Sequence, residues 1–277
     1  MRPSTSLGAG AVVLAVLLTA LAADARSAEA ARRTDPLLAA RQFYNAGQFD
    51  RAIDAATEAA SNPSFASSAH LVLGRCRLER YRKSSAASDL DAARTDLRAV
   101  DPRALDSRER LELQVGLAVL LFFDGRFGAA AELLNPLVDM ASTLAPDARD
   151  RALEWWATSL DRQAQAMDPS DREPIYARVI DRMEAEQKRD VMSRAACYWI
   201  AAASRGAGDL DRAWAMAQAC WVRASLAPDH GEALRADLDK LVTQAIIPEQ
   251  ATKAGARDRR QAIGLLTAKW EDFKKDW

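Results

Sequence analysis

The hydrophobic positions along the chain recur with the period of an α-helix. Ala213, Ala217 and Cys220 fall on one helical stripe, and the run from 52 to 59 has a similar spacing. Prolines end helices because they lack an amide hydrogen, and they punctuate the pattern at Pro63, Pro102, Pro146, Pro169, Pro228 and Pro248. No segment predicts a β-strand. The pattern therefore predicts an all-α fold.

Three segments share the pattern of a helical hairpin, at residues 39–63, 116–137 and 195–221. In each, an apolar helix ends at a glycine, a bulky residue follows two positions later, and an alanine follows three positions after that. The glycine allows the left-handed turn that ends a helix, and the small alanine lets two helix axes approach closely. The matching sets are Gly47, Phe49 and Ala52; Gly125, Phe127 and Ala130; and Gly208, Leu210 and Ala213.

This pattern resembles the tetratricopeptide-repeat (TPR) family. The positions of the first helix of that repeat are carried by Phe43, Leu121 and the pair Trp199-Ile200, and those of the second helix by the glycine, bulky and alanine sets. The resemblance implies an α-solenoid of TPR-like hairpins, about five pairs, closed by C-terminal capping helices. The expected solenoid covers residues 34–247 and the expected helical cap residues 248–277.

The rest of the chain carries weaker signals of the same kind. Residues 70–102 predict a further hairpin, in which Lys83 to Ser88 replaces the glycine turn. Residues 147–188 predict another hairpin with no repeat signature, and residues 234–247 and 262–274 predict terminal amphipathic helices.

Asn135-Pro136 is a local misfit, because it falls inside the expected second helix of the 116–137 hairpin. Proline there removes a backbone hydrogen bond and clashes with the preceding turn. The pair therefore predicts a kink or an early stop near Leu134.

The N-terminus has the three parts of a secretory signal. A basic start at Arg2 precedes an apolar run from Ala11 to Ala23, and small residues at Ala23 and Ala25 form a cleavage site. The run rises only about 20 Å as a helix, against a hydrocarbon core of about 30 Å. We expect a signal peptide over residues 1–25, with cleavage after residue 30 as an alternative. The mature chain would then be secreted or periplasmic with no membrane span. The alternative is an uncleaved membrane anchor.

Composition and charge argue against several classes of function. The chain has 38 Lys+Arg and 39 Asp+Glu, for a net charge of −1, which argues against nucleic acid as a partner. Its two histidines and three cysteines form no zinc, nucleotide-binding or nucleophile motif. We therefore expect no cofactor, no metal and no catalytic residue.

Two questions about packing stay open at this stage. Cys197 and Cys220 lie at ends of antiparallel helices that meet, so they form either a disulfide or two buried thiols, with Cys76 left free. Tryptophans crowd the second half of the chain, and the adjacent Trp155 and Trp156 cannot share one helix face. Each of these tryptophans belongs either to the core or to a binding surface.

The TPR resemblance also implies a concave groove lined by the first helix of each pair. Fitting the register of that family to this chain gives the candidate partner-binding residues Arg41, Tyr44, Asn45, Arg75, Leu78, Glu79, Phe122, Phe123, Tyr198 and Arg205. Phe122 and Phe123 either form an exposed apolar step or pack in part against the next hairpin. The set lacks the lysine and asparagine clamp with which some relatives hold a terminal carboxylate.

The main hypothesis is an exported, non-catalytic scaffold that binds a protein or peptide in this groove, in a cell-envelope complex. One alternative is an envelope hydrolase, such as one acting on peptidoglycan, which needs a close carboxylate pair facing a cavity. Another is a solenoid that assembles with itself through its C-terminal helix, ending Trp270 to Trp277.

Overall fold

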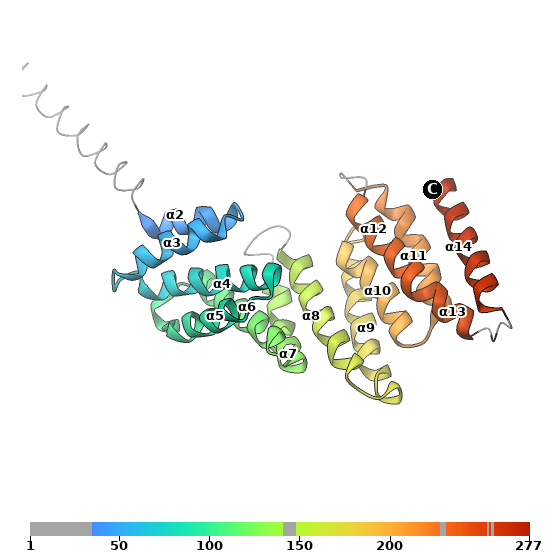
Figure 1. The fold of residues 1–277 in the computed structure, drawn as a ribbon, viewed down its shortest axis with the longest axis horizontal. Coiled ribbons are helices and arrows are strands. Elements are labelled where there is room, and N and C mark those ends of the chain that lie inside the picture. The colour runs from blue at the N-terminus through green and yellow to red at the C-terminus, as the bar shows by residue number, and fades with distance from the viewer. Residues whose placement is uncertain (1–34, 141–147, 228–230, 254, 256–257) are drawn as a thin grey trace, which may run out of the picture. The chain divides into compact units, whose positions relative to one another are not determined.

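The fold is seen in a computed structural model of the 277-residue chain, which describes residues 35–140, 148–227, 231–253, 255 and 258–277. The expected signal peptide, its alternative cleavage site and the alternative anchor lie outside the described residues. Within the described part, the secondary structure is helical and no strand occurs, which confirms the all-α prediction (Figure 1). No helix in these ranges is long and apolar enough to cross a bilayer.

The chain divides into two compact units, Met1–Gly116 and Leu117–Trp277, with the boundary inside helix α6 (Ser107–Phe123). The first unit contains α2 (Pro36–Asn45), α3 (Phe49–Ala60), α4 (Ala66–Ser84), α5 (Ala87–Ala99) and the short turn η1 (Pro102–Ala104). The second contains α7 (Phe127–Met140), α8 (Ala148–Gln165), η3 (Pro169–Asp171), α9 (Glu173–Arg189), α10 (Arg194–Gly206), α11 (Leu210–Ala224), α12 (Glu232–Leu241), the π-helical turn η4 (Val242–Ile246), α13 (Ile247–Lys253) and α14 (Arg259–Asp276).

Helices that are neighbours in sequence pack against each other within each unit. In the first, α2 packs on α3 and α4 on α5; in the second, α7 packs on α8 and α10 on both α9 and α11. Gly47, Gly125 and Gly208 have φ angles of 70°, 72° and 83°, so each provides the left-handed turn predicted between two helices. The turn without glycine uses Ser85 instead, with a φ of 56°.

The early stop expected near Leu134 is wrong, because α7 continues through Pro136 to Met140. The kink expected as its alternative stays a prediction. The C-terminal half of this helix is held by tertiary packing, since Leu134, Leu137 and Val138 are all buried. Apolar burial of this extent offsets the hydrogen bond that proline removes.

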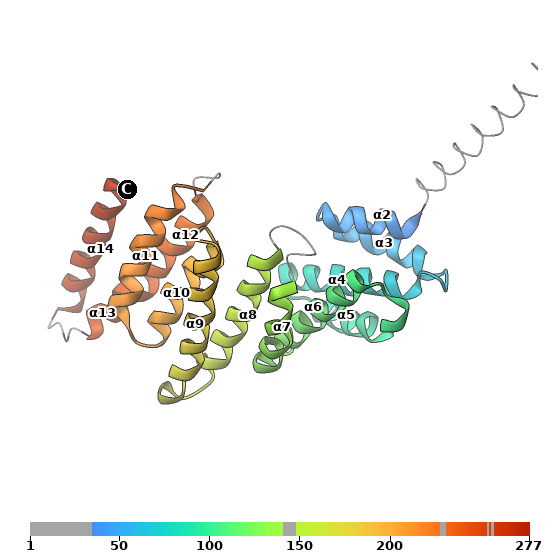
Figure 2. The same cartoon turned by 180° about the vertical axis from the view of Figure 1, so that it is seen from behind.

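The tryptophans of the second unit divide between core and partial exposure. Trp156 is 1% exposed and fills the core formed by α7 to α10, whereas its neighbour Trp155 is partly buried at the edge of that core. Trp270 of α14 is completely buried and packs against Trp214 and Trp221 of α11. The expected cap, residues 248–277, therefore shares a core with α11, and Figures 1 and 2 show α14 beside α11 and α13 from both sides.

A disulfide joins Cys197, near the start of α10, to Cys220, near the end of α11. It ties together the two helices of one hairpin at their adjoining ends. Cys76, which is buried in the first unit, is the free cysteine, and burial raises the pKa of its thiol to about 12. This thiol is therefore protonated and unreactive at neutral pH.

Candidate binding groove

A groove in the second unit is formed by three alternate helices, α8, α10 and α12. Helix α10 contacts both α8 and α12, so it forms the middle of the surface. The groove has a volume of about 430 Å³. Its lining residues are Glu154, Thr158, Asp161, Arg162 and Gln165 from α8; Arg194, Ala195, Tyr198 and Trp199 from α10; and Leu234 and Asp237 from α12.

The spacing of these residues explains why they face one way. On α8 they follow each other at intervals of three or four positions, or lie next to one another, so they form a single helical stripe. The pattern repeats on α10 from Arg194 to Tyr198 and on α12 from Leu234 to Asp237. The opposite faces of α8 and α10 carry Trp156 and Ile200 into the core.

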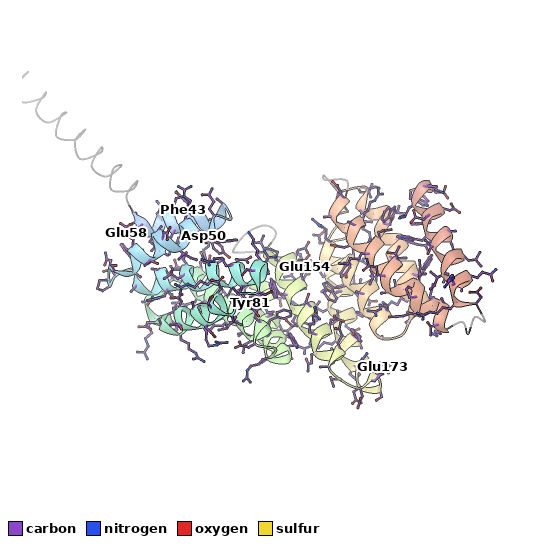
Figure 3. The ribbon with its side chains drawn as sticks, in the orientation of Figure 1. Phe43, Asp50, Glu58, Tyr81, Glu154 and Glu173 are labelled. Atoms are coloured by element: carbon purple, nitrogen blue, oxygen red, sulfur yellow. A yellow bond between two sulfur atoms is a disulfide. The ribbon has the colours of Figure 1, made fainter. Side chains whose placement is uncertain are left out.

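Two acidic residues of the groove, Glu154 and Asp161, have raised pKa values. Partial desolvation by the groove walls raises the pKa of Glu154, and the like charges of Asp150 and Asp237 raise it further, against the lowering effect of the positive charge of Arg194. Desolvation also raises the pKa of Asp161, against the lowering effect of a hydrogen bond from Tyr176. Figure 3 marks Glu154 on α8.

Asp161 is held from behind by a tyrosine of the neighbouring helix α9. The hydroxyl of Tyr176 donates a hydrogen bond to Asp161 Oδ1 at 2.9 Å, and burial raises the pKa of Tyr176 to about 12, so the proton stays on the hydroxyl. The ring of Tyr176 packs on Gly206 at the end of α10, where any Cβ would collide with it. Glycine at 206 is thus required for this tyrosine to reach Asp161.

The arginines beside the groove differ in their partners. Arg205 Nε donates to Glu249 of α13 at 3.0 Å, and this bond raises the pKa of the guanidinium. Arg162 is exposed and makes no hydrogen bond or ion pair with the described residues. Glu154 and Asp237 are likewise exposed and without such a partner in the described ranges.

The groove also has an aromatic wall. The ring of Tyr198 is partly buried and meets the ring of Trp199 edge-to-face, with centroids 5.5 Å apart. Desolvation raises the pKa of the Tyr198 phenol, and the nearby charge of Asp237 raises it further. Tyr198 therefore presents a neutral hydroxyl and an apolar ring face at neutral pH.

Candidate residues of the first unit are drawn into contacts within the protein. The guanidinium of Arg75 lies 4.3 Å from the ring centroid of Tyr44 and forms an ion pair with Glu112. Arg41 forms an ion pair with Glu109. We call these five residues the first-unit cluster.

The other candidates of this unit differ in exposure. Glu79 pairs with Arg82 at 2.8 Å, and Asn45 is exposed at the end of α2. The expectation that Leu78 lines a binding surface is wrong, because its side chain is only 4% exposed. Leu78 follows the apolar periodicity of α4, which carries it inward.

Phe122 and Phe123 pack against the next hairpin. The ring of Trp155, on α8, meets both rings edge-to-face, at centroid distances of 5.1 Å and 5.8 Å. Phe122 also meets Phe127, at 5.2 Å. The pair is therefore part of an aromatic cluster and is only partly exposed.

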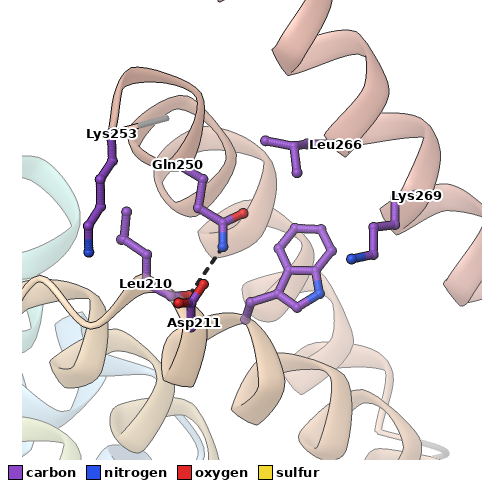
Figure 4. A pocket seen from close by; sticks show the side chains of 7 residues that line it. Leu210, Asp211, Gln250, Lys253, Leu266 and Lys269 are labelled. Carbon is purple, nitrogen blue, oxygen red and sulfur yellow. Dashed lines mark hydrogen bonds between the residues drawn. The ribbon is translucent and has the colours of Figure 1, made fainter. Parts of the chain in front are cut away.

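A second cavity of about 450 Å³ lies between α11, α13 and α14 (Figure 4). Trp214 and Leu266 form its apolar part, and Gln250 Nε2 donates to the carbonyl oxygen of Leu210 at 3.4 Å. Lys269 lies over the ring of Trp214, 5.5 Å from its centroid. Gln250, Lys253 and Lys269 of this cavity thus already contact the protein itself.

Sequence reasoning found Tyr198 and Arg205 but missed the residues of α8 and α12 that complete the groove. The stripe of Glu154, Thr158 and Asp161 was available as helical spacing, yet the 147–188 hairpin had no repeat signature to give it a register. Nothing local to Asp237 indicates that it faces α8.

Among the described residues, no group of three or more His, Cys, Asp or Glu side chains is placed to hold a metal ion. Comparison of the chain with protein-family models, curated proteins and solved structures gives no match.

Proposed function

We propose that the protein is an exported, TPR-like solenoid scaffold that binds a protein or peptide segment in the groove of α8, α10 and α12. The observation that carries this proposal is the convergence of three helical stripes on one cavity of about 430 Å³. That volume lies within the range of about 300–1,000 Å³ common for binding pockets.

The lining suits a peptide better than a purely apolar ligand. Thr158 and Gln165 can exchange hydrogen bonds with a peptide backbone, and Tyr198 offers a ring for a side chain. Charges of both signs are present on the same surface, as at many protein interfaces.

The proposed export rests on the signal-like residues 1–25 and has one supporting feature in the fold. Disulfides persist in oxidising compartments, and the Cys197–Cys220 bond fits a periplasmic or secreted protein. A role within a cell-envelope complex would follow from that location.

Photo-crosslinking in the native envelope tests the scaffold function. A crosslinking amino acid at Tyr198 or Arg162 is compared with one at Asp181, an exposed position on α9 that is not among the groove residues. We expect one discrete partner at both groove positions and none at 181. Equal labelling at all three positions, or crosslinks only within the chain, would contradict the proposal.

The hydrolase alternative is supported by one observation, the raised pKa of Glu154 beside Asp237 in a cavity. Glu154 and Asp161 are two turns apart on α8, about 10 Å along the helix axis, which exceeds the carboxylate separation used for glycoside hydrolysis. The acid and base would therefore be Glu154 and Asp237. Release of soluble fragments from purified peptidoglycan, lost in Glu154→Gln and kept in Glu173→Gln, would establish this alternative.

The self-assembly alternative requires side chains other than Trp270, because Trp270 is buried within the chain and cannot contact a second copy. Leu265 of α14, 67% exposed, and Trp277 at its end, 62% exposed, are apolar groups on which it would depend. Sedimentation that depends on concentration in the natural sequence but not in Leu265→Glu would favour it.

A further inference from the structure

Some charges of the groove are already compensated inside the protein, and others are not. Asp161 accepts a hydrogen bond from the hydroxyl of Tyr176, and Arg205 is paired with Glu249. Within the described residues, Glu154, Asp237 and Arg162 make no hydrogen bond or close ion pair, although Arg194 attracts Glu154 and Arg162 attracts Asp161 from farther away. These three residues are therefore the groups that a bound segment can satisfy.

The three uncompensated charges are arranged unevenly along the groove. The negative charges of Asp150 and of Asp237, on α12, disfavour the ionisation of Glu154, on α8, whereas the positive charge of Arg194, which lines the same end of the groove, favours it. Arg162 lies eight positions beyond Glu154 on the same stripe, about 12 Å along the helix. The groove thus has two carboxylates at one end and Arg162 farther along, and its other lining arginine, Arg194, lies near Glu154 but already has an interaction of its own.

The surface beside the two carboxylates is apolar and aromatic. Tyr198, Trp199, Ala195 and Leu234 all line the same cavity. An arginine or lysine side chain has the matching form, because a methylene stem packs on apolar and ring surfaces while the charged head reaches a carboxylate. The ring face of Tyr198 also attracts a cation electrostatically.

We infer that the groove selects peptide segments that carry an arginine or lysine, whose charged head lies between Glu154 and Asp237 and whose stem packs on Tyr198. The inference rests on the proposed peptide binding. Arg162 adds a second preference, for an acidic residue in the same segment. An extended chain advances about 3.3–3.6 Å per residue, so the acidic residue falls about four positions from the basic one.

Selection from a displayed library of random dodecapeptides on the purified protein tests the specificity. The protein is used as exported and processed by its host, and the same selection is run on the double variant Glu154→Lys/Asp237→Lys. A second double variant, Glu58→Gln/Asp181→Asn, is the matched control, since both of its carboxylates are exposed and neither lines the groove. Figure 3 marks Glu58 on α3.

We expect arginine or lysine to be enriched at one position in peptides from the natural protein and the control, and an acidic residue to replace it in peptides from the lysine variant. The recovered peptide should lose about tenfold in affinity when its arginine is replaced by citrulline, which keeps the shape and removes the charge. In Glu154→Gln/Asp237→Asn this citrulline effect should disappear. The circular dichroism spectrum shows whether each variant has folded.

Two other results overturn the inference in distinguishable ways. Peptides that bind the groove without any basic preference, or with an unchanged preference in the lysine variant, refute the specificity and leave the scaffold function standing. Failure to enrich any peptide, together with no crosslinked partner at Tyr198, refutes the scaffold function and the specificity with it.

Discussion

The first-unit cluster and the groove of the second unit use the same kinds of residue in opposite ways. In the cluster, Arg75 lies on the ring of Tyr44 and pairs with Glu112, so its charge and its aromatic ring satisfy each other. In the groove, Tyr198 lies beside Glu154 and Asp237, and these carboxylates have no such partner within the described residues. Internal pairing stabilises a fold, whereas charges left uncompensated at a cavity are available to a ligand.

The largest expected effect is a loss of stability at Glu186. It tests whether a carboxylate of the second unit stabilises the fold when it is paired with arginines, as the carboxylates of the first-unit cluster do. Glu186 of α9 is 2% exposed, and it accepts hydrogen bonds from Arg149 at 2.7 Å and from Arg189 at 3.0 Å. Glu186→Gln should lower the free energy of unfolding by about 3 kcal/mol, because it removes a buried charge that two arginines share and leaves the partly buried Arg149 with Asp139 as its remaining charge partner. Urea denaturation measures this loss.

Glu173→Gln, at an exposed position on the same helix, is the control and should change stability by less than about 0.5 kcal/mol. The loss at Glu186 should also depend on pH. Burial alone would raise the pKa of this carboxyl, but its two arginines hold it at about 2. Its stabilising contribution is therefore complete above the usual glutamate pKa and fades as the pH falls towards 2. A loss in Glu186→Gln that stays constant down to pH 2 would show that charge is not its cause.

The second effect concerns the first-unit cluster. Arg75→Met keeps a long apolar side chain but removes the charge that pairs with Glu112 and faces Tyr44. We expect a loss of about 2 kcal/mol in the free energy of unfolding, with unchanged crosslinking at Tyr198.

The exposed Arg98 of α5 offers the matched control, Arg98→Met, which should be nearly neutral. If Arg75→Met were stable but lost the crosslinked partner, the cluster would be a binding surface and the contrast with the groove would fail.

The smallest expected effect is a gain in the free energy of unfolding, in Glu154→Gln, whereas the two preceding variants are expected to lose stability. The pKa of Glu154 is raised, so the folded protein holds this proton more tightly than the unfolded chain does, and stability falls as the pH rises through the pKa of the folded state. Glu154→Gln should therefore stabilise the protein at pH 7, by no more than about 0.5 kcal/mol because the side chain is exposed.

The gain from Glu154→Gln should vanish below the usual carboxyl range, where both states are protonated. Thermal melts of the variant and the natural protein at pH 7 and pH 3 measure the difference. A destabilised Glu154→Gln would mean that this carboxylate has a partner in the fold, and the groove would then resemble the first-unit cluster.

Most of the helical elements could be predicted because their signals are local. Glycine at 47, 125 and 208 has access to positive φ angles whatever surrounds it, and the spacing of apolar residues decides which face of a helix can be buried. The early stop expected near Leu134 did not occur, because burial of Leu137 and Val138 outweighs the local penalty of Pro136. Leu78 was wrongly predicted to line the groove because it was assigned from the repeat register of another family. That register does not say whether a side chain in this chain is buried.

The all-α chain and its glycine turns could be predicted because each depends on nearest neighbours along one helix or turn, and the TPR resemblance added Tyr198 and Arg205, which lie at or beside the groove. Which charges are compensated depends instead on how the helices pack. The pairing of Arg75 with Glu112, and of Arg205 with Glu249, joins residues far apart in sequence. The meeting of Glu154 with Asp237 requires α8 and α12 to pack on the same helix. Charge compensation is a property of distances in space, and helical periodicity carries no information about those distances.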